Sequence, residues 1–295
     1  MPMTPSNLRP SMTPITDLIA SGPTRSLEFF PPRTEEAERQ FHSALGELVG
    51  LGPSFASVTY GALGSTRHST RDLVVGMNAE HPFPTMAHLT CVGHTRGEIG
   101  ALLDEYARTG VRNILALGGD PPADGGSPGG DFAHAIELVE IVREHPGDFC
   151  VGVAAHPETH PRSADRAGDR RRLAEKLRLA HFAITQFFFD TAHYRRLVQE
   201  LADLGCDQPV VAGVMPFVSA AGLRRMADMN RTSIPADLSR RLDLVADDPT
   251  AVTELGVETA TRLCAELVEA GAPGIHLYTL NRSASVRRVW ENLPA

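Results

Sequence analysis

The sequence predicts a single-domain α/β protein with the (β/α)8 TIM barrel fold. Eight short apolar runs, rich in β-branched and aromatic residues, alternate with amphipathic helical segments along the chain. Nearly all the unusual polar residues fall at the carboxyl ends of these runs. Because active sites in this fold lie at the carboxyl ends of the strands, this placement indicates an enzyme. A length of 295 residues suits one such barrel.

The expected strands are bounded by Gly, Pro or Asp, which interrupt regular structure. They lie near 26–30, 55–60, 85–91, 113–118, 150–155, 182–188, 209–215 and 274–280. The first strand carries a carboxylate, Glu28, directly before two phenylalanines and two prolines. The fourth strand runs into two glycines followed by Asp120. These are the two strand ends at which we expect carboxylate chemistry.

Helices are expected between the strands, because apolar residues recur there at helical spacing. Thr95, with Glu98 three residues later, forms a capping-box pattern that begins a helix, and Gly110 is placed to end it. The other clear helical segments are 35–49, 132–144, 169–179, 191–204 and 250–270, with an additional helix within 230–248. We therefore expect a barrel domain over 16–295, preceded by a mobile arm of residues 1–15.

Composition limits the classes of partner. The net charge of -8 argues against a protein that binds nucleic-acid phosphates. No apolar run approaches the ~20 residues of a membrane span, and the amino terminus lacks the apolar core of a secretion signal. The four cysteines are widely spaced, as in proteins of a reducing compartment. We expect a cytoplasmic protein without nucleic-acid or membrane partners; nothing in the sequence predicts its oligomeric state.

Two carboxylates are candidate catalytic residues. Glu28 lies among aromatic residues, and such surroundings favour the protonated form that a general acid needs. The alternative for Glu28 is a structural carboxylate paired with an arginine at the barrel rim. Asp120 follows Gly118 and Gly119, which allow a ligand to approach the backbone closely. Asp120 could pair with the N–H edge of a heterocycle or stabilise a cation, or it could cap the following turn.

Other polar groups at the strand ends have both functional and structural interpretations. Gln186 is an amide in an apolar run and needs a partner, either a substrate or a neighbouring side chain. Arg282 could bind a carboxylate, stack on a ring, or form a salt bridge at the rim. His156 and His160 flank a proline that breaks the helix needed to place both imidazoles on one face, so we expect no metal site. The loop 118–130 is either a surface connection or a lid over the barrel mouth.

Seven motifs in order resemble the 5,10-methylenetetrahydrofolate reductase family, and the resemblance runs from about residue 25 to 292. They are Glu-Phe-Phe-Pro-Pro (28–32), Val-Thr-Tyr-Gly (58–61), His-Leu-Thr-Cys (88–91), Gly-Asp-Pro-Pro (119–122), His-Pro-Glu-Thr-His-Pro (156–161), Ile-Thr-Gln-Phe-Phe-Phe-Asp (184–190) and Tyr-Thr-Leu-Asn-Arg (278–282). Each motif is weak alone, whereas seven with barrel spacing are specific. The chain ends after the barrel, so we expect no counterpart of the regulatory domain of eukaryotic members.

The resemblance implies reduction of the methylene group of methylenetetrahydrofolate to a methyl group. Glu28 matches the family's general acid, which protonates the folate nitrogen whose departure opens the five-membered ring and leaves a 5-iminium cation. Asp120 matches the carboxylate that grips the pterin and favours that cation. The positions that match the folate site are Thr59, Gln186, Tyr278, Leu280 and Arg282, together with Asp120.

Most members of the family carry FAD and relay hydride in a ping-pong reaction. The resemblance assigns cofactor contacts to Thr59, His88, Gly119, His156, Asp169, Lys176 and Gln186. Several flavin-contacting positions depart from the family. Gly118 and Glu175 replace arginines, His156 replaces a tyrosine, Arg172 replaces an Asn or His, and Leu179-Ala180 replaces Ala-Gly. Losing one cation and gaining one anion near a diphosphate would each cost ~1–3 kcal/mol of binding.

These departures lead us to expect weak FAD binding or none, with NADH or NADPH passing hydride directly to the iminium carbon in a ternary complex. Two alternatives remain at this point. The first is an ordinary flavin-dependent reductase with compensating contacts. The second is a catalytically idle barrel that binds folate, although an unused Glu28 in an apolar strand would be costly to retain.

Overall fold

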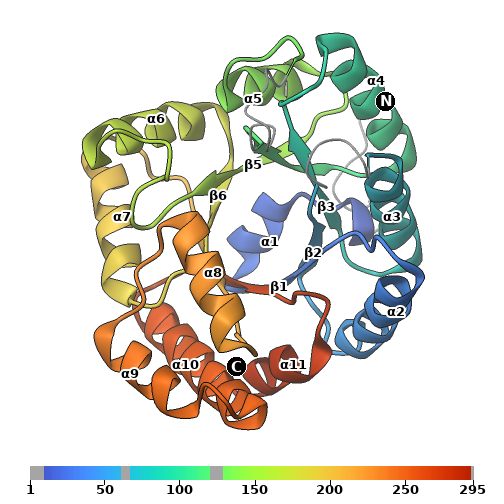
Figure 1. Cartoon of the computed structure of the whole chain (residues 1–295). Coiled ribbons are helices and arrows are strands. Elements are labelled where there is room, and N and C mark those ends of the chain that lie inside the picture. The colour runs from blue at the N-terminus through green and yellow to red at the C-terminus, as the bar shows by residue number, and fades with distance from the viewer. Residues whose placement is uncertain (1–9, 61–66, 120–128, 294–295) are drawn as a thin grey trace.

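The structure is a computed structural model that describes residues 10–60, 67–119 and 129–293. Eight strands form a closed barrel in the order β1 to β8, and every neighbouring pair, including β1 and β8, is parallel. The helices surround the barrel (Figure 1). The predicted (β/α)8 fold is therefore confirmed.

The strands lie close to their predicted positions. They are β1 (Thr24–Phe29), β2 (Phe55–Val58), β3 (Thr85–Thr90), β4 (Asn113–Leu117), β5 (Cys150–Ala155), β6 (Phe182–Thr185), β7 (Val210–Val214) and β8 (Gly274–Tyr278). The prediction for β6 was wrong at its end, because the strand stops at Thr185 rather than at 188. Phe187 and Phe189 instead pack with Phe217 in a separate apolar cluster beyond the strand ends.

Helices lie between the strands as expected, although the sequence analysis gave no ranges for α3, α8 and α11. The helices around the barrel are α2 (Glu35–Val49), α3 (Arg67–Glu80), α4 (Arg96–Thr109), α5 (Ala135–Glu144), α6 (Arg166–Leu179), α7 (Thr191–Asp203), α8 (Ala220–Asn230), α9 (Ala236–Val245), α10 (Pro249–Glu269) and α11 (Ser283–Glu291). The capping box of Thr95 and Glu98 begins α4, and Gly110 ends it in the left-handed conformation. The helix α6 begins three residues before the predicted start, because Asp165 accepts a hydrogen bond from the Gly168 N–H and caps it.

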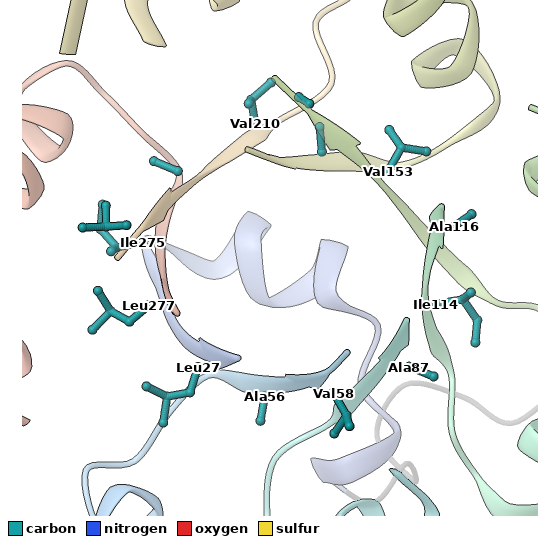
Figure 2. Close-up of a cluster of buried hydrophobic side chains, with 14 of the residues drawn as sticks. Leu27, Ala56, Val58, Ala87, Ile114, Ala116, Val153, Val210, Ile275 and Leu277 are labelled. Atoms are coloured by element: carbon teal, nitrogen blue, oxygen red, sulfur yellow. The ribbon is translucent and has the colours of Figure 1, made fainter. Parts of the chain in front are cut away.

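The main hydrophobic core lies between the barrel and its helices. Side chains from alternate strand positions, such as Leu27, Val58, Ile114 and Leu277, point away from the ring of strands towards the helices (Figure 2). The intervening positions point into the barrel. At the amino end these inner residues are apolar, and they pack together as Phe55, Met86, Leu115, Cys150, Phe182, Ile184 and Val211.

The amino end of the barrel is covered by a helix that the sequence analysis did not predict, α1 (Ile15–Ser21), seen inside the ring of strands in Figures 1 and 2. Ile15 is fully buried and joins the inner apolar cluster. The Ile15 N–H donates to Asn113 Oδ1 at 2.8 Å, and Asn113 Nδ2 donates to the Thr13 carbonyl at 3.0 Å. Residues 1–9 of the predicted arm lie outside the described residues, whereas residues 13–15 are bound to β4.

No helix in the described part of the chain combines the length and the apolar character needed to cross a membrane.

Candidate functional site

The inside of the barrel changes from apolar to polar towards the carboxyl ends of the strands. Strand register explains which side chains meet there: Glu28 of β1 lies beside Ser57 of β2 and Tyr278 of β8, and Ser26 lies beside His276. All of these residues except Tyr278 are at most 6% exposed. A cluster of ionisable groups is thus enclosed at the mouth of the barrel, where this fold places its chemistry.

Glu28 is the centre of the cluster. Its Oε2 atom lies 3.3 Å from His276 Nε2, 3.4 Å from His88 Nε2 and 3.5 Å from the Ser57 hydroxyl, which donates to it. In the described part of the chain no arginine or lysine pairs with this carboxyl group. The structural alternative, a carboxylate neutralised by an arginine at the rim, is therefore not what these residues form.

His276 connects Glu28 to two hydroxyl groups. Its Nδ1 atom lies 2.7 Å from Ser26 Oγ, and its Nε2 atom lies 3.2 Å from Ser57 Oγ. The ring is fully buried and stacks on Phe55. Sequence reasoning missed His276, although a signal was present: it stands two residues before Tyr278, so strand alternation places both side chains inside the barrel.

His88 and Tyr278 complete the surroundings of the carboxyl group. Burial lowers the pKa of His88 to about 4, with His276 lowering it further and Glu28 opposing the shift, so His88 is neutral at pH 7. Its Nε2 atom is within ion-pair distance of Glu28 but makes no hydrogen bond to any described residue. Burial and the nearby Glu28 raise the pKa of Tyr278 well above its usual value, and its hydroxyl donates to the Thr185 carbonyl at 2.6 Å.

The turn after β8 is tightly fixed to β1. The Thr279 hydroxyl donates to the Glu28 carbonyl at 2.6 Å, and the Asn281 side chain bonds both the N–H and the carbonyl of Phe30 at 2.9 Å. Leu280 and Asn281 adopt left-handed conformations with φ of 50° and 54°. Such strain persists where surrounding contacts hold it, and it is common at functional sites.

The other predicted folate positions lie on the strand ends around this cluster. Thr59 directly follows β2 and is partly buried, and Arg282 is exposed at the start of α11. Gln186 directly follows β6, and its amide nitrogen donates to Asn230 Oδ1 at 3.1 Å. Its partner in the structure is thus a side chain of α8. Gly119, with φ of +81°, is the last described residue before Asp120, which lies outside the described residues together with the rest of 120–128.

The remaining predicted cofactor positions lie on α6 and on the loop of residues 156–165 between β5 and α6, called the β5 loop here. Burial, with neighbouring positive groups, lowers the pKa of His156 to about 3, and its ring packs edge-on against His160 with centroids 4.5 Å apart. Both oxygens of Asp169 are engaged, one by the Ser163 hydroxyl at 2.8 Å and the other by Arg170 at 2.6 Å. Burial lowers the pKa of Lys176, and Asp169 opposes that shift.

Arg170 fixes the β5 loop and was not anticipated from the sequence. Its guanidinium donates to the carbonyls of His156, Pro157 and Glu158 at 2.7 to 3.0 Å and to Glu200 at 2.8 Å. Burial disfavours the charge on Glu200, but hydrogen bonds from arginines outweigh it and lower the pKa of Glu200 to about 2. An Arg in a helix gives no local signal that it will bind carbonyls of a preceding loop.

Comparison with known proteins identifies the family of this chain. The family model described as methylenetetrahydrofolate reductase matches residues 15–294. The chain is 35% identical to 5,10-methylenetetrahydrofolate reductase of Escherichia coli K12, over 88% of this chain and 86% of the relative. It is also 35% identical to methylenetetrahydrofolate reductase (NADH) 1 of Arabidopsis thaliana, over 91% of this chain and 48% of the relative. The chain thus spans about half the length of that plant relative.

A solved structure supports the fold. The chain superposes with a TM-score of 0.61 on an uncharacterized protein from Clostridium thermocellum, described as binding two copies of 5-methyl-5,6,7,8-tetrahydrofolic acid. The two are 14% identical, and the match covers 94% of this chain and 96% of the other. On the family model and the bacterial relative, this chain belongs to the methylenetetrahydrofolate reductase family.

Proposed function

We propose that this protein reduces 5,10-methylenetetrahydrofolate to 5-methyltetrahydrofolate with NADH or NADPH as the hydride donor. The observation that carries the proposal is the Glu28 carboxyl group, 6% exposed and enclosed by His88, His276 and the Ser57 hydroxyl at the barrel mouth. The named activity of the relatives supports the same reaction.

Ring opening needs an acid, and Glu28 supplies it in our proposal. Protonation of the folate nitrogen by Glu28 breaks the bond from that nitrogen to the methylene carbon and leaves a 5-iminium cation. Hydride from the dihydronicotinamide adds to the iminium carbon, which gives the methyl group and the oxidised nicotinamide. Glu28, now ionised, regains a proton before the next turnover. Asp120 stabilises the cation by its charge.

The neighbours of Glu28 suit this cycle. His88 is neutral at pH 7, so it places no positive charge beside the carboxyl group of Glu28. His276 lies in hydrogen-bond contact with both Glu28 and Ser26, so it fixes the orientation of the carboxyl group. Tyr278 stays protonated and keeps its ring beside Gly213, where a Cβ atom would lie 2.8 Å from the Tyr278 hydroxyl.

We infer further that hydride passes directly from the nicotinamide to the folate, with FAD bound weakly or not at all. Two charged residues of α6 that could meet a flavin diphosphate, Asp169 and Arg170, are already held by other groups of the protein. Arg170 donates hydrogen bonds to the loop after β5 and to Glu200. Asp169 accepts hydrogen bonds from Ser163 and Arg170. Glu175, at a position where the family has an arginine, is exposed and adds a negative charge to α6.

The folate would lie against Thr59, Gln186, Tyr278, Leu280 and Arg282, as the family resemblance assigns. The nicotinamide would share the mouth of the barrel with it, near His88, Gly119 and the β5 loop. All four cysteines are free and buried, which suits the reducing cytoplasm in which we place the protein. We retain the division into an amino-terminal arm and a barrel domain as part of this proposal.

The test is an absorbance spectrum of freshly purified protein, followed by NADH oxidation with methylenetetrahydrofolate and no added FAD. A colourless, active protein is the expected result. A yellow protein, or activity that requires added FAD, would overturn direct transfer and indicate the flavin-dependent reaction. A protein that binds folate but turns over neither with nor without FAD would be a folate-binding barrel.

A further inference from the structure

Gln186, one of the predicted folate positions, has a backbone that is held rigidly by neighbouring strands. Its N–H donates to the Ala155 carbonyl at 2.7 Å. The Thr185 carbonyl, directly before it, accepts from the Tyr278 hydroxyl at 2.6 Å, and the Thr185 hydroxyl accepts from the Gly213 N–H at 2.8 Å. Only the side chain of Gln186 is left to choose an orientation, so the direction of its amide depends on the groups that the amide contacts.

A chain of three hydrogen bonds runs from the residues after β6, through two side-chain amides, to the end of α8. The Phe187 N–H donates to Gln186 Oε1 at 2.9 Å. Gln186 Nε2 donates to Asn230 Oδ1 at 3.1 Å, and Asn230 Nδ2 donates to the Met226 carbonyl at 2.9 Å. Asn230 is the last residue of α8, and Met226 lies one turn before it in the same helix.

The two ends of this chain determine the direction of every bond in it. A backbone N–H can only donate and a backbone carbonyl can only accept, whereas a side-chain amide can be turned over with little change in shape. The Phe187 N–H requires the oxygen of Gln186, which turns the Gln186 nitrogen towards α8. The Met226 carbonyl requires the nitrogen of Asn230, which leaves the Asn230 oxygen to accept from Gln186. Both requirements give the same arrangement, so the Gln186 amide is held in one orientation.

The end of α8 is anchored to the β5 loop and to the residues after β6. Arg231 ends the helix in the left-handed conformation, with φ of 50°. The hydroxyl of the next residue, Thr232, donates to the Phe187 carbonyl at 3.4 Å. Ser233 donates to the Glu158 carboxylate through its N–H at 2.9 Å and through its hydroxyl at 2.6 Å. These bonds fix the end of the helix, and with it the amide of the last helical residue.

The fixed amide of Gln186 keeps hydrogen-bonding capacity for a ligand. A side-chain amide has two N–H groups and two lone pairs on its oxygen, and Gln186 commits one of each to the protein. One donor and one acceptor, in a set order, remain for a ring that presents the complementary pair. The pterin ring of a folate presents such a pair, because its carbonyl oxygen lies next to a ring N–H.

We propose that Asn230 is a positioning residue for the folate substrate, and that it acts by holding the Gln186 amide in the orientation that binds the pterin ring. The inference rests on the proposed function, and it adds a residue of α8 to which the family resemblance gives no role. A side chain that already has its binding orientation loses less conformational entropy when the ligand binds, so the effect is on folate affinity. In the described part of the chain Asn230 makes no hydrogen bond or ion pair with the cluster around Glu28, so the chemical step should not depend on it.

Calorimetric titration with 5-methyltetrahydrofolate, which needs no hydride donor, tests this role. We expect Asn230→Ala to weaken folate binding by about 3- to 10-fold and to raise the folate KM by a similar factor, while kcat stays within about twofold of wild type. In a protein that already carries Gln186→Ala, the Asn230→Ala change should cause no further loss, because the side chain through which Asn230 acts is absent. A disturbed helix end would instead weaken binding in both backgrounds, so the cycle separates positioning from structural damage.

Asn292→Ala is the matched control. Asn292 follows α11, and its Nδ2 atom donates to the Arg288 carbonyl at 2.8 Å, the same helix-end bond that Asn230 makes in α8. Its side chain makes no second hydrogen bond within the described residues, so this variant should bind folate as the wild type does. If Asn230→Ala does not fold, Asn230→Ser can still bond the helix carbonyl but is too short to reach Gln186, and the same loss is expected.

Three outcomes separate the positioning role from the proposed function. Wild-type folate affinity in Asn230→Ala, or an equal further loss in the Gln186→Ala background, would overturn the positioning role and leave the proposed function intact. The expected coupling in a protein that shows no turnover would count against the proposed function alone. A wild-type protein that does not bind 5-methyltetrahydrofolate would overturn both.

Discussion

Among single residues, Glu28 shows how a barrel prepares an acid. Its neighbours at hydrogen-bond or ion-pair distance are imidazoles and a hydroxyl, and no arginine or lysine pairs with it in the described part of the chain. Sequence reasoning found Glu28 from its place in an apolar strand, and it found His88 and Tyr278 only through the family resemblance. It missed His276 because a histidine inside an apolar strand is read as core until the register of the neighbouring strand is known.

Replacing Glu28 by Gln should lower turnover by at least about 10²-fold, because the amide keeps the shape of the side chain but cannot protonate the leaving nitrogen. Folate affinity should remain within a few-fold of wild type. Single-turnover kinetics with NADH and methylenetetrahydrofolate, combined with a binding titration, measure both quantities. Turnover that survives the substitution would show that the acid has been assigned wrongly.

His276 should act as a positioning residue for Glu28. His276→Phe keeps a stacking ring against Phe55 but removes both nitrogen contacts, so we expect kcat to fall by about 10- to 100-fold and its pH profile to shift. The control is His181→Asn, which changes a histidine that contacts Arg143 and the Val151 N–H, away from the cluster. An unaltered pH profile in His276→Phe would leave this histidine with a packing role only.

Among the elements, the strand ends and the turns that follow them fix the positions of the site residues. The turn after β8 is fixed by Thr279 and Asn281, and the β5 loop is fixed by Arg170. Most strand bounds and the helices α2, α4, α5, α6, α7, α9 and α10 could be predicted from periodicity and caps, whereas α1, α3, α8 and α11 were not. The end of β6 could not be predicted, because an aromatic run satisfies a strand and a loop that packs under α8 equally well until the tertiary contacts of Phe187 and Phe189 are known.

Gly119 provides a test of these turns. Its φ of +81° strains any other residue, and an added Cβ atom would lie 3.0 Å from Val92 Cβ and 3.1 Å from Thr90 Cβ. Gly119→Ala should cost ~2 kcal/mol or more in the free energy of unfolding and raise the folate KM, because Asp120 follows directly. Gly271→Ala is the matched control, with φ of +79° and open space around the Cβ position. Urea unfolding should show ~1 kcal/mol for the control.

For the whole molecule, the layered barrel interior accounts for both stability and chemistry. Apolar residues fill the amino end of the barrel interior, and ionisable residues lie at its carboxyl end. The cluster around Glu28 is therefore supported from below by packed apolar side chains. The polar residues at the carboxyl ends of the strands could be predicted, because the ends of apolar runs can be located in the sequence alone. Contacts between distant segments, such as the one between Ser26 and His276, depend on the closure of the barrel between β1 and β8. These contacts could not be predicted from the sequence.

Stability should fall on mild acidification. The pKa of His88 is about 4 and that of His156 about 3 in the folded protein, against about 6.5 in the unfolded chain. Below about pH 6.5 the unfolded chain therefore takes up protons that the folded protein does not, and stability declines progressively towards pH 4. Each histidine should account for on the order of 2 kcal/mol at pH 5. Urea unfolding across this range measures the slope, and His156→Gln should reduce it; a slope identical to wild type would contradict the assignment.

The helix α1 has a kinetic consequence. Because α1 covers the amino end of the barrel, small molecules are left with the opposite rim as their entrance, and under the proposed direct transfer the folate and the nicotinamide would share it. Whichever reactant lies deeper has to enter first and depart last. A site that is closed at one end therefore favours ordered binding of the two reactants. An excess of the second reactant to bind would then trap the first product in the barrel.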